Sequence, residues 1–277
     1  MTMAGALGLV IGLTLALTGA GGGILAVPAL VFGLGLTMAE AGPIALFAVA
    51  MAAAFGATLG LRAGVVRYRA AGVMAAAGMA LSPLGIRTAH QLPNAPLAGI
   101  FGLFLAWVAV QVLRRARVEA ASAGAASVRL PTAPRPLCAR DPVRGRFIWT
   151  GPCASALAGC GLLAGFLSGL LGVGGGFIIV PLLARISDLP MRSITATSLA
   201  VITFVSASGV VFAALDGQIQ WHVALPFAVG AVAGMVAGRR IADHIAGHRL
   251  QQMFAAVAGV VAIAMLYKSA IWAAGLN

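Results

Sequence analysis

Gly172-Val-Gly-Gly-Gly-Phe-Ile-Ile-Val-Pro-Leu-Leu183 repeats the pattern of Gly19-Ala-Gly-Gly-Gly-Ile-Leu-Ala-Val-Pro-Ala-Leu30, which lies 153 residues earlier in the chain. The same separation pairs other residues without a gap, among them Gly8 with Gly161, Gly12 with Gly165, Met38 with Met191, Tyr68 with Trp221, Gly85 with Gly238, Arg87 with Arg240, and Phe101 with Phe254. Self-similarity at one fixed separation is the mark of an internal repeat. The sequence therefore predicts two homologous halves.

The composition places both halves in a membrane. Of 277 residues, 61% are hydrophobic and 9% are charged, and the mean hydropathy is +1.03. Eight apolar stretches reach or approach the roughly 20 residues that span a bilayer: 5–35, 43–61, 70–90, 95–113, 148–184, 194–215, 221–238 and 250–272. We expect an all-α integral membrane protein with four segments in each half. Few residues remain for a soluble catalytic domain, so we expect no enzyme.

A basic linker separates the halves. Eight arginines lie between Arg114 and Arg146, against only Glu119 and Asp141. Such a patch could bind nucleic acid, but beside membrane spans it is explained more simply by the excess of basic residues in cytoplasmic loops. We therefore predict a first transmembrane repeat at 1–113, a cytoplasmic linker at 114–147 and a second repeat at 148–277. We expect a multi-pass protein of the plasma (inner) membrane and no nucleic-acid partner.

Basic residues also indicate how the halves are oriented. The loop after the second segment carries Arg62, Arg67 and Arg69, whereas its counterpart offers Asp216 and His222. The loops after the third segment show the reverse bias, with Arg87 and His90 in the first half and Arg239, Arg240 and Arg249 in the second. Equivalent loops on one side of a membrane should carry equivalent charge. The pattern therefore predicts inverted repeats, which require an odd number of crossings per half.

The glycine segment is the one we expect not to cross. Residues 150–185 would form a helix of about 50 Å, well beyond a hydrocarbon core of about 30 Å. A run of three glycines interrupts a helix. Five positions after the last glycine of each run lies a proline, Pro28 or Pro181, which lacks an N–H and disfavours continuation of the helix. We predict a re-entrant or discontinuous segment in each half, with the prolines contributing to the break.

Two such breaks meeting near the midplane would form a binding site. A half-helix N-terminus presents free N–H groups and a partial positive charge, which favours an anion. The substrate-binding residues predicted on this basis are Gly21, Gly22, Gly23, Gly174, Gly175 and Gly176. The alternative is that these glycines only allow close helix packing.

Hydroxyl groups follow the second glycine run. Thr197 and Ser198 lie near the start of the next segment and are predicted as polar partners of the anion, although the first half has Ile44 and Ala45 there. For Thr203, Ser206 and Ser208 we expect hydrogen bonds back to the preceding turn or to neighbouring helices, both common for serine and threonine in membrane helices. The predicted site is therefore asymmetric.

Other residues give little sign of further chemistry. The three cysteines form no CxxC pair, so we expect neither a disulfide nor a metal site from them. His244 and His248 have the i, i+4 spacing of metal ligands, but a third ligand is not evident, and we expect no metal and no cofactor. Arg185 is interpreted as an interfacial anchor in preference to an anion ligand.

The motifs also resemble those of the TauE/SafE sulfite exporter family. The resemblance rests on Gly-x-Gly-Gly-Gly-(x)4-Pro in both halves, on Thr197-Ser198 and on Gly238-Arg-Arg-Ile-Ala242, and it covers nearly the whole chain except the linker. It implies export or uptake of small sulfur-containing anions, such as sulfite, sulfonates or sulfoacetate, by a multi-pass protein of the plasma membrane.

The sequence thus favours a secondary transporter of a small anion, with the lipid bilayer and a coupling proton or cation as its other partners. The alternative is a non-transporting membrane assembly factor or scaffold. The anion, the direction of transport, the coupling ion and the oligomeric state are left open.

Overall fold

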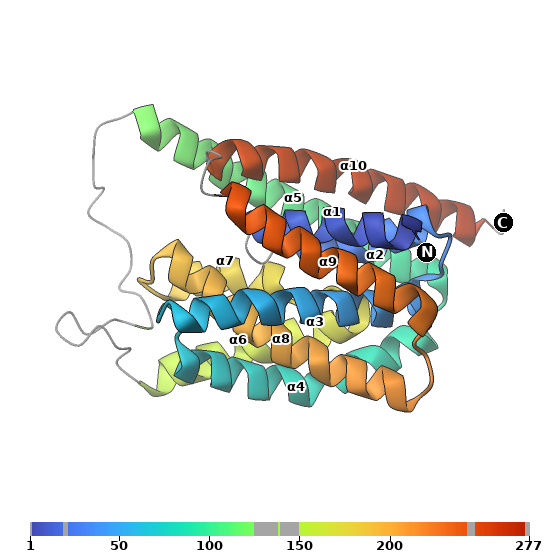
Figure 1. Cartoon of the computed structure of the whole chain (residues 1–277), viewed down its shortest axis with the longest axis horizontal. Coiled ribbons are helices and arrows are strands. Elements are labelled where there is room, and N and C mark those ends of the chain that lie inside the picture. The colour runs from blue at the N-terminus through green and yellow to red at the C-terminus, as the bar shows by residue number, and fades with distance from the viewer. Residues whose placement is uncertain (1, 19–21, 125–137, 139–149, 243–246, 275–277) are drawn as a thin grey trace.

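The chain forms a bundle of helices, shown in Figure 1. The computed structural model describes residues 2–18, 22–124, 138, 150–242 and 247–274. In these residues the helices are α1 (Thr2–Thr18), the 3-10 helix η1 (Gly22–Leu25), α2 (Ala26–Gly33), α3 (Met38–Arg62), α4 (Tyr68–Gln91), α5 (Asn94–Gly124), α6 (Gly151–Leu171), α7 (Gly176–Ile186), α8 (Met191–Leu215), α9 (Trp221–Ala242) and α10 (Gly247–Ala273). Seven helices in the described part are long and apolar enough to cross a membrane. The prediction of an all-α integral membrane protein is confirmed.

Local signals explain several helix ends. Thr37 caps α3 through a capping box, because its N–H donates to the Glu40 carboxylate at 2.9 Å and its Oγ1 accepts from the N–H of Glu40. Thr150 caps α6, with a proline in the first turn. That helix ends at Gly172, which has the left-handed conformation typical of a helix C-terminus. These ends fix where the long helices stop and the glycine segments begin.

Each glycine segment folds back as a hairpin. In the first half, Gly22 packs on the backbone of Leu15 and Gly33 packs on the side chain of Leu7, so η1 and α2 run antiparallel to α1. In the second half, the N–H of Cys138 donates to the carbonyl of Ile186 at 2.9 Å, and Cys138 is bonded to Cys153. The end of α7 therefore lies beside the start of α6. Helices of 8 and 11 residues are about 12 and 16 Å long, too short to cross a core of about 30 Å.

The two halves have matching helix limits. The helices α3 and α8 begin at Met38 and Met191 and end at Arg62 and Leu215, each pair 153 positions apart. The starts of α4 and α9 and the starts of α5 and α10 have the same separation. Segments that match in sequence at this separation thus form helices with matching limits.

Equivalent helices run in opposite directions. Gly56 of α3 packs on Leu199 of α8, while Gly209 of α8 packs on Leu46 of α3, so the two helices are antiparallel. Ser269 of α10 donates to the carbonyl of Ala95 at 2.7 Å, and Leu266 packs on Gly102, so α5 and α10 are antiparallel too.

The remaining pairs join one half to the other through close backbone approach. Helix α1 packs along α9, and a methyl group on Gly8 or Gly12 would overlap the carbonyls of Phe227 or Ala231. Helix α6 packs along α4 in the same way, with Gly165 against the backbone of Gly78. Small residues permit such separations in membranes, where close packing stabilises helix pairs. Each hairpin is therefore held by a long helix of the other half.

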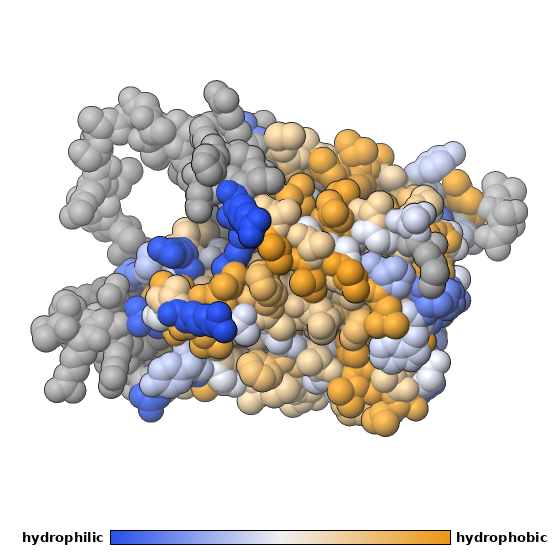
Figure 2. Space-filling model, in the orientation of Figure 1, coloured by the Kyte–Doolittle hydropathy of each residue, from blue (hydrophilic) through white to orange (hydrophobic). Residues whose placement is uncertain are grey.

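The two ends of the bundle differ in charge. The linker face is the end formed by the turns at 63–67 and 187–190 and by the end of α5, and the opposite face is the end with the turns at 34–37 and 216–220. Figure 2 shows an apolar belt with hydrophilic residues gathered toward the two ends. The arginines placed at the linker face are Arg62, Arg67, Arg69, Arg114, Arg185, Arg192, Arg239 and Arg240, whereas Arg87 and Lys268 lie toward the opposite face.

Candidate functional site

The two glycine breaks meet inside the bundle. A methyl group placed on Gly23 would lie 3.2 Å from the carbonyl oxygen of Val173 and 3.3 Å from the side chain of Val49. Gly23 belongs to the first break and Val173 to the second, so segments far apart in the sequence touch here. Both half-helices begin at this point and run outward, α2 toward the opposite face and α7 toward the linker face.

The second break has the backbone form that glycine permits. Gly174 and Gly175 have φ angles of 76° and 70°, in the left-handed region that disfavours any other residue. Helix α7 starts directly afterwards at Gly176, and the first N–H groups of a helix have no partner within it. The break therefore presents backbone donors at the positive end of a helix dipole.

A buried hydroxyl group faces this break. A methyl group on Gly174 would lie 3.1 Å from Oγ of Ser206, which is fully buried and has no hydrogen-bond partner. Buried polar groups are nearly always hydrogen-bonded, so each exception needs an explanation. An oxyanion held at the N-terminus of α7 would accept a hydrogen bond from Ser206.

Three further serines share this state. Ser82 of α4, Ser168 of α6 and Ser198 of α8 are fully buried and have no partner for Oγ. By contrast, Thr203 and Ser208 of α8 donate to the carbonyls of Leu199 and Val205 at 2.8 and 2.7 Å. The expectation of back-bonding is thus confirmed for Thr203 and Ser208 and is wrong for Ser206. Ser198 and Ser206 are about two turns apart on one side of α8, a spacing visible in the sequence.

None of these four serines has a hydroxyl-bearing counterpart in the other half. The positions equivalent to Ser168, Ser198 and Ser206 in the first half are Leu15, Ala45 and Ala53, and the position equivalent to Ser82 in the second half is Met235. The buried serines are therefore distributed asymmetrically, with one in the first half and three in the second.

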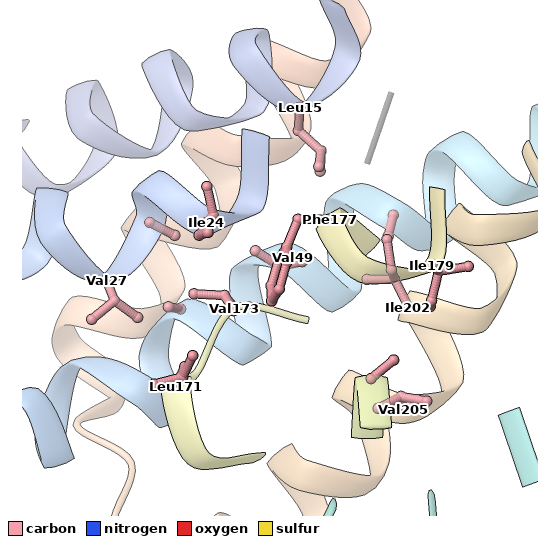
Figure 3. Packing of buried hydrophobic residues seen from close by; sticks show 14 of the residues in the cluster. Leu15, Ile24, Val27, Val49, Leu171, Val173, Phe177, Ile179, Ile202 and Val205 are labelled. Carbon is pink, nitrogen blue, oxygen red and sulfur yellow. The ribbon is translucent and has the colours of Figure 1, made fainter. Parts of the chain in front are cut away.

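Apolar side chains close the space between the breaks. Figure 3 shows Val49, Val173, Phe177 and Ile202 gathered around the point where the two segments meet. Val49 and Ile202 approach Gly174 most closely, at 2.9 and 3.0 Å from a methyl group placed there. A solute could reach the break only after these side chains moved, so the arrangement is a closed one.

The structure places the other predicted site residues differently. Thr197 does not face the break, because its Oγ1 accepts a hydrogen bond from the N–H of Arg67 at 3.1 Å. Gly22 packs on α1, where a methyl group would overlap the backbone of Leu15. Gly176 is the buried first residue of α7. Gly21 lies outside the described residues, as does His244.

The prediction that Pro28 and Pro181 help to break the helices is wrong. Pro28 is the third residue of α2 and Pro181 the sixth residue of α7, so both lie inside helices. In the second half the interruption falls at the glycines, because positive φ angles at Gly174 and Gly175 turn the chain before α7 starts. Pro28 lies in the first turn of α2, where the N–H groups have no intrahelical partner. Pro181 lies beyond the first turn of α7, where its missing N–H removes one intrahelical bond without ending the helix.

The sequence of this chain matches known proteins over nearly its full length. The model of the family described as "Sulfite exporter TauE/SafE" matches residues 4–265. The chain belongs to this TauE/SafE family. Two relatives from strains 9a5c and Temecula1 of Xylella fastidiosa, each named "Probable membrane transporter protein", are 31% and 30% identical to the chain. Each alignment covers 95% of this chain and 93% of the relative.

A further relative from Methanocaldococcus jannaschii is also named a probable membrane transporter protein and is 31% identical over 39% of this chain and 43% of its own length. No solved structure gives a significant match. The resemblance to the TauE/SafE family is confirmed, and the chain is a multi-pass protein of a membrane transporter family.

One bond in this TauE/SafE chain corrects the expectation from the cysteines. Cys138 and Cys153 form a disulfide across 15 residues, which ties the linker to the first turn of α6. The two cysteines are too far apart in the sequence for a CxxC motif. The fold brings them together through the bridge between Cys138 and Ser187. Cys160 is free and buried. Within the described residues, no group of three potential ligands could hold a metal ion.

Proposed function

We propose that this chain is a secondary transporter which binds a small anion at the break formed by Gly174, Gly175 and Gly176. The observation that carries the proposal is the hydroxyl of Ser206, buried without a partner and directed at Gly174 beside the start of α7. Ser198 lies about two helical turns, roughly 12 Å, nearer the start of α8, so it would meet the anion at another point of the path and not together with Ser206. Catalysis has no part in this proposal.

The electrostatics favour an anion over a cation. The N-terminal ends of both half-helices point to the meeting point, and each carries a partial positive charge. The acidic side chains of the described residues, Glu40, Asp188 and Asp216 among them, lie at helix ends near the two faces. A buried cation would therefore lack a counter-charge among the described residues.

The inverted arrangement supports alternating access. Antiparallel pairing of α3 with α8 and of α5 with α10 is the relation expected of inverted repeats, whose rocking exposes a central site to each side in turn. The arginines at the linker face support a cytoplasmic linker and a plasma-membrane location. A proton or cation gradient would supply the driving force.

The substrate class follows from the family description together with the chemistry of the break. Sulfite-like oxyanions and small organosulfonates carry several acceptor oxygens, which suit a few N–H and O–H donors at close quarters. The family to which the chain belongs is described as a sulfite exporter family. We therefore propose a sulfur-containing oxyanion or organosulfonate as the substrate.

The test is transport by the purified protein in proteoliposomes. Labelled sulfite, sulfate, thiosulfate and a small sulfonate are offered one at a time, with and without a pH gradient. Saturable movement of one anion supports the proposal, and its response to the gradient identifies proton coupling. Absence of movement for all four, in protein that remains folded, favours a non-transporting assembly factor or scaffold.

A further inference from the structure

A small pocket opens at the opposite face, away from the linker. It is lined by residues of α3, α4 and α6, including Met38, Leu46, Ile86, His90, Gly169 and Leu170. Met38 starts α3 and His90 lies in the last turn of α4, so the mouth is at the end of the bundle. Leu46 and Ile86 are deeper and almost fully buried.

Leu46 and Ile86 also form the barrier between this pocket and the hydroxyls of Ser82 and Ser206. A methyl group on Gly209 of α8 would lie 3.1 Å from Leu46, 3.3 Å from Ile86 and 3.3 Å from Oγ of Ser82. Gly209 is about one helical turn beyond Ser206, which faces the break. The pocket is thus separated from the proposed site by the side chains that converge on Gly209.

The repeat places a matching barrier toward the linker face. The residues 153 positions away from Leu46, Ile86 and Gly209 are Leu199, Arg239 and Gly56. Leu199 packs on Gly56, at 2.9 Å from a methyl group placed there, and Nη2 of Arg239 donates to the Gly56 carbonyl at 3.2 Å. The two barriers share one architecture, but only the linker-face barrier contains a cation.

We propose that these two triplets are the gates of the solute path. The opposite-face gate is Leu46, Ile86 and Gly209, and the linker-face gate is Leu199, Arg239 and Gly56. Arg239 latches the linker-face gate through Gly56 and, when that gate opens, offers its guanidinium to the passing oxyanion. This inference rests on the proposed function, because it assigns the entrances to the same central break.

The chemistry of the two gates explains why they behave differently. The three residues of the opposite-face gate are apolar, so they contribute no side-chain hydrogen bond that opening must break. Opening the linker-face gate breaks the bond between Arg239 and Gly56. A guanidinium presents a planar fork of donors that suits an oxyanion. During passage the oxyanion therefore takes the place of the Gly56 carbonyl as an acceptor for Arg239.

Accessibility of the central site to each face tests the gates without any transport assay. Ser206→Cys is made in a background with Cys138→Ser, Cys153→Ser and Cys160→Ala, and labelling by an impermeant maleimide is timed in right-side-out and inside-out membrane vesicles. Leu199→Ala is expected to speed labelling from the linker face, and Leu46→Ala from the opposite face. If both variants speed labelling from the same face, the gate assignment is wrong.

The latch is tested in the same background with neighbouring arginines. Arg239→Gln is expected to raise labelling from the linker face about fivefold, in keeping with the loss of one hydrogen bond from a charged donor at a partly exposed site. Arg240→Gln, at an exposed position of the same helix turn, is the matched control and is expected to change nothing. An unchanged rate for Arg239→Gln overturns the latch.

Failure of the gates and failure of the central site give different results. If the thiol introduced by Ser206→Cys reacts from both faces and a small sulfonate slows the reaction, the site stands whatever the gate variants do. If this thiol reacts from neither face in any of the gate variants, while the background protein transports anions, the path does not pass Ser206. That result overturns the proposed site as well as its gates.

Discussion

The backbone N–H of Arg67 donates a hydrogen bond to Oγ1 of Thr197 at 3.1 Å, joining the turn after α3 to the second turn of α8. Ser193 reinforces the contact by donating to the carbonyl of Val65 at 2.6 Å. A hydroxyl that the sequence marks as a substrate ligand therefore fastens two helices from different halves. This reassignment changes what a substitution at Thr197 should do.

Thr197→Val should lower stability and leave substrate affinity unchanged. Valine keeps the shape of threonine but leaves the N–H of Arg67 without a partner, at a cost of about 1–2 kcal/mol. Thermal unfolding in detergent and the KM for the transported anion measure the two effects, with Thr197→Ser as the variant that keeps the hydroxyl. A raised KM at unchanged stability would show that Thr197 binds the anion after all.

Ser206→Ala should give the reverse result. Its hydroxyl has no partner, so its removal should not destabilise the protein, whereas loss of a hydrogen bond to an anion weakens binding by about tenfold to a hundredfold. Ser208→Ala is the matched control, because Ser208 bonds only to the preceding turn of the same helix. Equal KM values for the two variants would contradict the role of Ser206.

Gly175→Ala is a poor test of the site, although the motif draws attention to it. Gly175 has a φ of 70°, and a methyl group there would lie 2.6 Å from the carbonyl oxygen of Ala164. We expect lost detergent stability whether or not the break binds an anion. Thermal unfolding measures this loss, and a Gly175→Ala protein that is as stable as the wild type would show that the break is not as rigid as the packing implies.

The orientation of the halves predicts where single cysteines react. Arg67→Cys lies at the linker face and Gln218→Cys in a turn at the opposite face, so an impermeant maleimide should label them from different sides of the membrane. Intact cells and inside-out vesicles provide the two sides. Labelling of both positions from one side would refute the inverted arrangement.

The bond between Cys138 and Cys153 should respond to the compartment. In purified, oxidised protein both thiols should resist maleimide until a reductant is added, and Cys153→Ser should cost up to about 3 kcal/mol of unfolding free energy in the loop-entropy account. A cytoplasmic linker face opposes the bond in living cells, where thiols are kept reduced. Acid quenching of intact cells followed by thiol labelling shows whether Cys138 and Cys153 are free or bonded in living cells. If they are bonded, the linker lies on the non-cytoplasmic side of the membrane.

Much of the fold could be predicted because its causes are local patterns. Apolar length gives the long helices, and the repeat separation of 153 gives matching limits for α3 and α8. The prediction that the prolines break the helices was wrong because the sequence pattern does not show that the positive φ angles of Gly174 and Gly175 already turn the chain. Ser206 was undervalued because a free hydroxyl and a back-bonded hydroxyl look alike in sequence. The disulfide and the bond to Thr197 depend on contacts between distant segments, which no local pattern contains.

The pairing of α1 with α9 and of α6 with α4 has a consequence for biogenesis. Helix α1 leaves the ribosome long before α9, the helix that α1 packs against, which does not begin until Trp221. The second hairpin, in contrast, emerges after α4 is already in the membrane. The first hairpin must therefore wait, with its glycine-lined face covered only by lipid or by an insertion factor, until α9 has been translated.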